Sequence, residues 1–448
     1  MTSCAMADLS MLHQAWQRAL EGKNEDALRA AIASVEDDAL QLGAVMLLAR
    51  TLLAEGRTFA VADAAEKLGE AYLRRGDLPS AVAAARIADE AAGEGTKLRQ
   101  RIADAFGKGS KRLAEISTSP PPLPTSPEIG TTLRALEGDG LLVRAEKALA
   151  TFVAAKDPVT EGKVPSLPLF SALGPKPLAR LLGAMSVRAL GTGERAIEQG
   201  TEGRDAFIVV HGVLRVERVP MNADRATMAE PPTVLALLGP GAIVGEMALV
   251  SDSPRAAAVV AQEPCEVLVI GRAELEKIAK DAPVIGEELG EFCRARMIAN
   301  LVRHSMILRA VPAADRESLM SRFATKTFSP GEALVTEGSE SEGLFVVASG
   351  TVRVTKKDAD GDELVLADLG PGDVVGEIGI VLRRPATASV RALSAAVTME
   401  LTRELFADAI RKHPTLLGEL YQLATDRDEE TRTVIGQEVL DIGDVVLL

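Results

Sequence analysis

The chain of 448 residues has little of several features that mark particular protein classes. Aromatic residues make up 3 % of it and hydrophobic residues 47 %, so a core has to be built mainly from Ala, Val, Leu and Ile. No apolar run approaches the ~18 residues that a membrane-spanning helix needs. The start, MTSCAMADLS, lacks a basic segment followed by an apolar one. We therefore expect no secretory signal, no membrane partner and a cytoplasmic protein.

Residues that bind metals or carry catalysis are also sparse. The three cysteines, Cys4, Cys265 and Cys293, lie far apart, which predicts a reducing compartment without disulfides or a zinc site. The four histidines are scattered singly: His13, His211, His304 and His413. A metal-dependent barrel enzyme needs two or three ligands on one sheet face. No Ser-His-Asp elbow, Walker loop or kinase H-R-D motif is visible. The sequence therefore predicts a protein that is not an enzyme, with no metal and no cofactor.

The charge balance argues against contact with nucleic acid. A net charge of −14 repels phosphate backbones. The last segment of the sequence, DRDEETRTVIGQEVLDIGDVVLL, is acidic and too short for a helix-turn-helix with a basic recognition helix. A local basic pocket is still compatible with this negative net charge.

Residues 1–115 have the composition of a helical domain, with breaks at glycines every 15 to 20 residues. LGEAYLRRGDLPSAVAAARIA, from Leu68 to Ala88, has the spacing of a tetratricopeptide repeat. In such a helix pair the small residues Gly69 and Ala81 would let the helices approach. A generic helical bundle fits the pattern equally well. Residues 116–130 contain five prolines and predict an extended linker, and residues 131–164 predict a helical connector.

The remainder is an internal duplication of a β-rich unit. GERAIEQG matches GEALVTEG, and FIVVHGVLRV matches FVVASGTVRV, both at an offset of 138 residues. LGPGAIVGE matches LGPGDVVGE at an offset of 131, with the extra residues in the polar loop MNADRATMAEPP. Short β-branched runs between Gly and Pro turns predict a barrel or sandwich. We assign residues 165–300 to the first repeat, 301–430 to the second, and 431–448 to an acidic-apolar tail.

One loop of the first repeat, GEMALVSDSPRAAAV, combines groups suited to a phosphate joined to a sugar. Backbone amides at the start of a turn attract an anion. An arginine adds a planar charged fork that fits phosphate oxygens. A glutamate accepts hydrogen bonds from a sugar hydroxyl, and small residues leave space for the ligand. The candidate binding residues are Gly245, Glu246, Met247, Ala248, Arg255, Ala256 and Ala257. For Arg255 the alternative is a surface arginine on a hairpin, and for Glu246 a carboxylate that caps its own turn.

The second repeat carries the same loop, GEIGIVLRRPATASV, with Ala386 in place of Arg255. Loss of a charge-assisted hydrogen bond weakens binding by roughly 1.5–3 kcal/mol. Arg383 and Arg384 are close in sequence, but the tip of a turn usually directs such side chains to solvent. We expect a weakened second site, whose candidate residues are Gly376, Glu377, Ile378 and Thr387.

From about Leu167 to Thr425 the sequence resembles tandem cyclic-nucleotide-binding domain proteins, such as regulatory subunits of cyclic-AMP-dependent kinase and bacterial cyclic-AMP receptors. The family's loop reads G-E-L-A-L, then P-R-A-A-T-V after a few residues. The resemblance implies two jelly-roll-like β-rolls with flanking helices. Together with the all-α helical-repeat domain expected at the N-terminus, the predicted fold class is an α+β multidomain protein. The resemblance also implies that Arg255 holds the cyclic phosphate, Glu246 binds the ribose 2′-hydroxyl, and nearby amides complete the site.

The expected function is a non-catalytic cyclic-nucleotide sensor. Sensors of cyclic GMP often have Thr or Ser after the arginine, so Ala256 favours cyclic AMP and leaves cyclic GMP open. Ligand would draw helices between Ala273 and Ser305 against the barrel, and the N-terminal helices would bind a protein partner. The Pro-rich linker has no arginine, unlike the inhibitor stretch of kinase regulatory subunits. The alternative function is a scaffold whose barrels bind no ligand.

Overall fold

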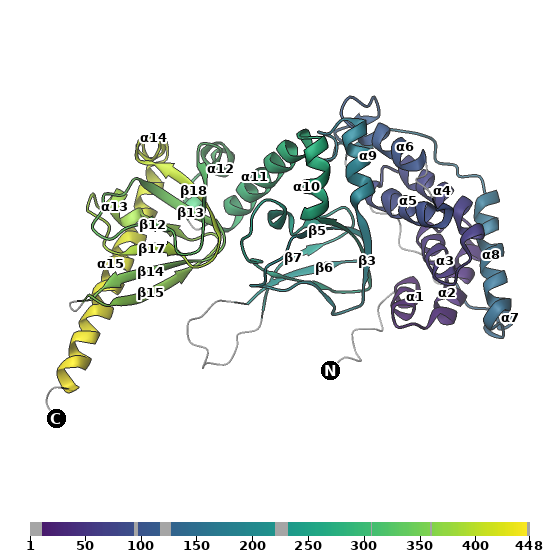
Figure 1. Cartoon of the computed structure of the whole chain (residues 1–448), viewed down its shortest axis with the longest axis horizontal. Coiled ribbons are helices and arrows are strands. Elements are labelled where there is room, and N and C mark those ends of the chain that lie inside the picture. Colours follow the sequence, from purple (N-terminus) through teal and green to yellow (C-terminus); the bar gives the residue numbers. More distant parts are fainter. Residues whose placement is uncertain are drawn as a thin grey trace.

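The computed structural model describes residues 11–93, 97–116, 127–219, 232–305, 307–358 and 361–445, with side chains described as far as Thr431. Cys4, most of the expected linker, most of the MNADRATMAEPP loop and the end of the expected tail lie outside these residues. The parts follow one another in a row, with helices at one end, a first barrel in the middle and a second barrel at the other end (Figure 1). Within the described residues no helix is long and apolar enough to cross a membrane.

The N-terminal domain is a set of packed helices that break at the expected glycines. They are α1 (Met11–Leu20), α2 (Asn24–Asp37), α3 (Leu42–Ala54), α4 (Thr58–Arg74), α5 (Leu78–Ala92) and α6 (Lys97–Phe106). Gly22, Gly56, Gly76 and Gly93 all have a φ between +72° and +77°. Such a left-handed conformation ends a helix at little cost only when the residue is glycine.

The close approach attributed to Gly69 and Ala81 involves a third helix. The open side of Gly69 is filled by Leu98 of α6, and a Cβ atom at Gly69 would overlap that side chain. Ala81 is fully buried in α5. Gly69 thus allows α4 to pack against α6 as well as α5. The tetratricopeptide character of these helices stays a prediction.

The segment expected as a connector belongs to the helical domain. It forms α7 (Thr131–Arg134) and α8 (Gly138–Ala154), and α8 packs along α2, α3 and α4. Leu141, Leu149 and Phe152 are fully buried there. The boundary placed at residue 115 is therefore too early, because the apolar face of α8 completes the helical core. Short parallel strands β1 (Leu113–Ala114) and β2 (Val164–Pro165) then bring the chain back beside α6.

The first barrel consists of two four-stranded sheets, with strand orders β3-β10-β5-β8 and β4-β9-β6-β7. Its elements are α9 (Pro175–Ala184), β3 (Ser186–Leu190), β4 (Arg195–Ile197), β5 (Asp205–His211), β6 (Leu214–Arg218), β7 (Thr233–Leu238), β8 (Ile243–Val244), the 3₁₀ helix η1 (Glu246–Leu249), β9 (Ala258–Ala261), β10 (Cys265–Gly271), α10 (Arg272–Asp281) and α11 (Val284–His304).

The second barrel repeats this topology, with orders β11-β18-β13-β16 and β12-β17-β14-β15. Its elements are η2 (Ile307–Ala310), α12 (Ala313–Met320), β11 (Ala324–Phe328), β12 (Ala333–Val335), β13 (Gly343–Ser349), β14 (Val352–Lys357), β15 (Glu363–Leu369), β16 (Val374–Val375), α13 (Glu377–Val381), β17 (Ser389–Ala392), β18 (Ala396–Thr402), α14 (Arg403–Lys412) and α15 (Pro414–Val445). The helix α15 continues through the boundary expected at residue 430, so the expected tail begins as helix.

Two contacts join these parts. One face of the first barrel, including Ile208, Leu268 and Ile270, shares a core with the N-terminal helices. The helix α11 is shared between the barrels, because Phe292 packs in the core of the first part and Leu301 in that of the second. A shift of α11 would therefore change the packing of both barrels.

Candidate functional site

The candidate loop of the first barrel begins at a left-handed glycine. Gly245 has a φ of +81°, follows β8 and caps η1. A Cβ atom at this position would come within 2.8 Å of the Arg255 guanidinium, so both backbone and space require glycine. The turn after β8 and the arginine at its far end therefore meet at one corner of the barrel.

Arg255 is half-buried at that corner. Its guanidinium donates from Nη1 to the carbonyl of Gly245 at 3.0 Å and from Nη2 to that of Asp205 at 2.6 Å. Burial lowers its pKa, and the carboxylates of Asp205 and Glu246 oppose that effect. Gly203 makes room, since a Cβ atom there would lie 2.7 Å from the guanidinium. The guanidinium is therefore fixed at the loop by two backbone carbonyls, partners that a solvent-exposed hairpin arginine would lack.

Glu246 is buried, with 5 % of its surface exposed. Its carboxylate pairs with Arg296 of α11, at 3.3 Å between Nε and Oε1. Arg296 also donates from Nη2 to the carbonyl of Ile243 at 3.1 Å, and the Cys293 thiol donates to the Glu246 carbonyl. The Glu246 carboxylate is thus held by the following helix. Sequence reasoning missed Arg296.

The other predicted residues of this loop lie on different sides of it. Ala248 is buried, and Met247 packs against the cores of both parts. Ala256 is exposed and Ala257 half-buried. The loop residues therefore surround Arg255 without covering it.

The second barrel has the same Glu–Arg pair. Glu377 is 3 % exposed and pairs with Arg427 of α15 at 2.8 Å. Arg427 donates to the carbonyl of Val374 at 2.5 Å, as Arg296 does to Ile243. All these positions are related by the offset of 131 residues. That repetition is the signal by which the sequence could have identified Arg296 and Arg427.

The corner without arginine has been rebuilt in the second barrel. Ser341 occupies the position that matches Gly203, and its hydroxyl lies 2.9 Å from the Gly343 carbonyl and 3.3 Å from that of Gly376. These two carbonyls match the pair that Arg255 contacts. Ala386 is buried beside them. The serine thus takes over the partners of the missing guanidinium.

The two arginines near Ala386 do not replace it. Arg384 lies 3.6 Å from Asp428 of α15 and is 47 % exposed. Arg383 has a left-handed φ of 52° at the tip of the turn. Neither lines the cavity of the second barrel. This placement agrees with the expectation that their side chains turn away from the loop.

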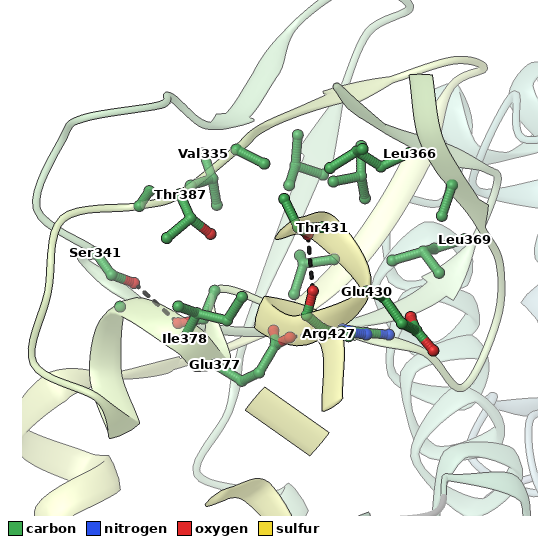
Figure 2. Close-up of a pocket in the computed structure, with 18 residues that line it drawn as sticks. Val335, Ser341, Leu366, Leu369, Glu377, Ile378, Thr387, Arg427, Glu430 and Thr431 are labelled. Carbon is green, nitrogen blue, oxygen red and sulfur yellow. Dashed lines mark hydrogen bonds and ion pairs between the residues drawn. The ribbon is translucent and has the colours of Figure 1, made fainter. Parts of the chain in front are cut away.

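A cavity of about 380 Å³ lies between the second loop and α15. Figure 2 shows Glu377, Ile378 and Ser341 on the side of the loop, and Arg427, Glu430 and Thr431 on the helix across from them. The apolar walls include Val335, Val354, Leu366, Leu369 and Val390. Gly376 and Thr387, two of the predicted second-site residues, also line it. The cavity is in the barrel whose loop lacks arginine, although the sequence pointed to the first barrel as the main site.

The family comparison agrees with the duplicated topology. The cyclic nucleotide-binding domain family matches residues 187–282 and again residues 325–413. Both repeats of the chain are thus similar to cyclic nucleotide-binding domains, arranged in tandem. They resemble those of the cAMP-dependent protein kinase regulatory subunit of Yarrowia lipolytica, at 30 % identity over 224 residues, which cover 50 % of this chain and 54 % of the relative.

Two further matches are of the same kind. The cAMP-dependent protein kinase type II regulatory subunit of Drosophila melanogaster is 26 % identical over 231 residues, covering 52 % of this chain and 56 % of the relative. The solved regulatory domain of Toxoplasma gondii PKA with cAMP covers 58 % of this chain and 92 % of that chain, at 23 % identity and a TM-score of 0.27. The chain spans little more than half the length of the two curated relatives.

Proposed function

We propose that this protein is a non-catalytic cyclic-nucleotide sensor whose ligand site is the loop of the first barrel. The observation that carries the proposal is the placement of Arg255, half-buried and held by two backbone carbonyls beside an anion-attracting turn. A scaffold that binds nothing has no use for a guanidinium positioned in this way. The similarity of both barrels to cyclic nucleotide-binding domains supports the same function.

Each predicted residue has a role in this proposal. Arg255 binds the cyclic phosphate, and Glu246 accepts a hydrogen bond from the ribose 2′-hydroxyl. The backbone of Gly245, Met247 and Ala248, with Ala256 and Ala257, forms the rest of the site. The two curated relatives are regulatory subunits of cAMP-dependent protein kinases, and Ala256 offers no hydroxyl to a guanine amine, so cyclic AMP is the proposed ligand.

The signal would pass from the loop into α11. A ribose bound at Glu246 changes the partner that Arg296 holds, and Arg296 lies on the helix shared by both barrels. Ligand shifts such an equilibrium only by its differential affinity for the two positions of the helix. The response is therefore a movement of α11 relative to the first barrel.

The N-terminal helices are proposed to bind a protein partner on the face directed away from the barrel. Phe59, at the start of α4, is 97 % exposed, which is unusual in a domain with so few aromatic residues. Exposed aromatic side chains are enriched at protein interfaces. Phe59 is thus free of the core that the helices share with the first barrel.

Ligand-induced thermal stabilisation tests the function. Ligand at a hundred times its dissociation constant stabilises a protein by roughly 2.7 kcal/mol. We expect cyclic AMP to raise the melting temperature of the wild-type protein, and Arg255→Ala to remove most of that rise. Arg204→Ala is the matched control, because Arg204 lies near the same site with its side chain 74 % exposed. The proposal fails if no cyclic nucleotide shifts the wild type, or if both variants respond like it.

A further inference from the structure

The cavity of the second barrel lacks what a cyclic phosphate requires. Ser341 holds the two carbonyls that an arginine would hold, and its single proton is committed to them. Arg427 is already paired with Glu377 and with the Val374 carbonyl. No guanidinium among the lining residues is left for a phosphate. Backbone amides and the uncharged Thr387 hydroxyl are what remain for a ligand there.

The charges around the two sites differ. In the first barrel Arg255 and Arg296 accompany the carboxylates of Glu246 and Asp205, which leaves no net charge. In the second barrel Arg427 accompanies Glu377 and Glu430, and all three line the cavity, which leaves one net negative charge. A phosphate would enter this partly open cavity against that charge, and the repulsion is stronger beside its apolar walls than in water.

Three positions have changed together, which marks the corner as a rebuilt one. The first barrel has Gly203, Ala248 and Arg255, and the second has Ser341, Gly379 and Ala386 at the matching positions. A Cβ atom at Gly379 would lie 2.5 Å from the Ser341 Cβ, so the smaller residue admits the serine. The space left by the guanidinium is filled by Ser341, while the rest of the cavity stays open.

We infer that the second barrel binds an uncharged nucleoside, a heterocycle on a sugar without phosphate. This rests on the proposed function in one respect, namely that the duplicated barrel was built for a base on a ribose. The aliphatic walls of Val354, Leu366 and Leu369 suit a flat ring. The Glu377 carboxylate can accept a hydrogen bond from a sugar hydroxyl, and the Thr387 hydroxyl offers the ligand one further hydrogen-bonding group. About 380 Å³ is within the range of small-molecule sites.

The test uses the full chain and reads the two barrels separately. The protein is first saturated with cyclic AMP and then titrated by calorimetry with adenosine or guanosine. We expect one further equivalent of at least one nucleoside, which cyclic AMP does not displace. Ala388→Leu adds bulk to the cavity wall and should abolish that equivalent while the cyclic AMP equivalent remains. Absence of any nucleoside binding to the folded wild type overturns the inference.

A specificity exchange provides the second arm. Ser341→Gly, Gly379→Ala and Ala386→Arg together recreate the first corner, and should raise the affinity of the second barrel for cyclic AMP at least tenfold. Ala386→Arg alone should not, because Ser341 still occupies the partners and the space. The inference is also overturned if wild-type protein binds cyclic AMP equally at two sites. Failure of the proposed function would appear differently, as loss of the first cyclic AMP equivalent with the nucleoside equivalent intact. If the triple variant does not fold, the wild-type titration and Ala388→Leu decide the question.

Discussion

At the scale of single residues, one substitution separates the two barrels, but it does not act alone. Arg255 is useful at its position only because Gly203 leaves it space. Ala386 is tolerated because the Ser341 hydroxyl reaches the Gly343 and Gly376 carbonyls, the two groups that a guanidinium would otherwise contact. The positions therefore differ as a set.

Base selectivity is a prediction at this scale. Ala256 has no hydroxyl, so cyclic AMP should bind the first barrel at least as tightly as cyclic GMP. Ala256→Thr adds a hydroxyl that can accept a hydrogen bond from a guanine amine, and should improve the relative affinity for cyclic GMP several-fold. Competition binding with both nucleotides measures the ratio. A clear preference of the wild type for cyclic GMP would contradict the role given to Ala256.

At the scale of elements, the helix after each barrel holds its loop through a buried glutamate that pairs with an arginine of the helix. Glu246 with Arg296, and Glu377 with Arg427, join loop and helix in the same way. Both carboxylates are buried, so removal of either arginine leaves a buried charge without its partner. The pairs fix where α11 and α15 lie against the barrels.

Double-mutant cycles measure that coupling. Arg296→Met should lower the free energy of unfolding by about 1–3 kcal/mol, and Glu246→Gln in addition should restore part of it. Arg427→Met should cost more, because its pair is shorter and Arg427 is less exposed than Arg296, at 24 % against 42 %. Urea unfolding of the four variants of each cycle provides the values. Strictly additive single changes would show that the pairs do not couple loop to helix.

Much of the element order follows from the sequence. Left-handed glycines mark the helix breaks, and the two repeat offsets predict that the two barrels have matching sheets. Both signals are local, because they depend on the backbone conformation of single residues and on short β-branched runs. The packing of α8 into the helical core and the place of Arg296 depend on contacts between distant segments. The exchange of Gly203 for Ser341 is visible in the sequence. Its role is clear only from the structure, where Ser341 contacts the carbonyls that match the two partners of Arg255.

At the scale of the whole molecule, the helical domain is docked on the first barrel through a mixed polar and aromatic contact. His211 of β5 lies 5.5 Å from the Trp16 ring of α1 and 5.1 Å from the His13 ring, between centroids. His13 lies 3.6 Å from Glu263, and Arg50 of α3 forms an ion pair with the buried Glu266. A domain held in this way moves with the barrel.

This contact predicts a pH dependence. Burial lowers the pKa of His211 to about 4, and the nearby His13 adds to the effect, against a hydrogen bond to the Pro264 backbone. The unfolded chain takes up a proton near pH 6.5 and the folded protein only near 4, so stability is lost as pH falls through that window. The loss should approach about 3 kcal/mol.

Thermal unfolding between these pH values, with His211→Phe as the comparison, measures this effect. The phenyl ring retains the stacking partner of Trp16 but does not titrate, so its melting temperature should fall less on acidification. The titration of Asp157 lies outside this pH range. Burial would raise its pKa, but hydrogen bonds from Arg75, the Val159 amide and Arg74 lower it to about 2, below the window. An equal acid response in both proteins would show that His211 is not responsible.

The central claim is that one barrel reads a cyclic nucleotide and the other does not. Calorimetric titration of the full chain with cyclic AMP tests it most directly, because it counts sites as well as measuring affinity. The account predicts one tight equivalent per chain, weakened roughly ten- to a hundredfold or more by Arg255→Ala, the loss of a charge-assisted hydrogen bond. Two equivalent tight sites, no tight site, or one site that survives Arg255→Ala unchanged would contradict the account.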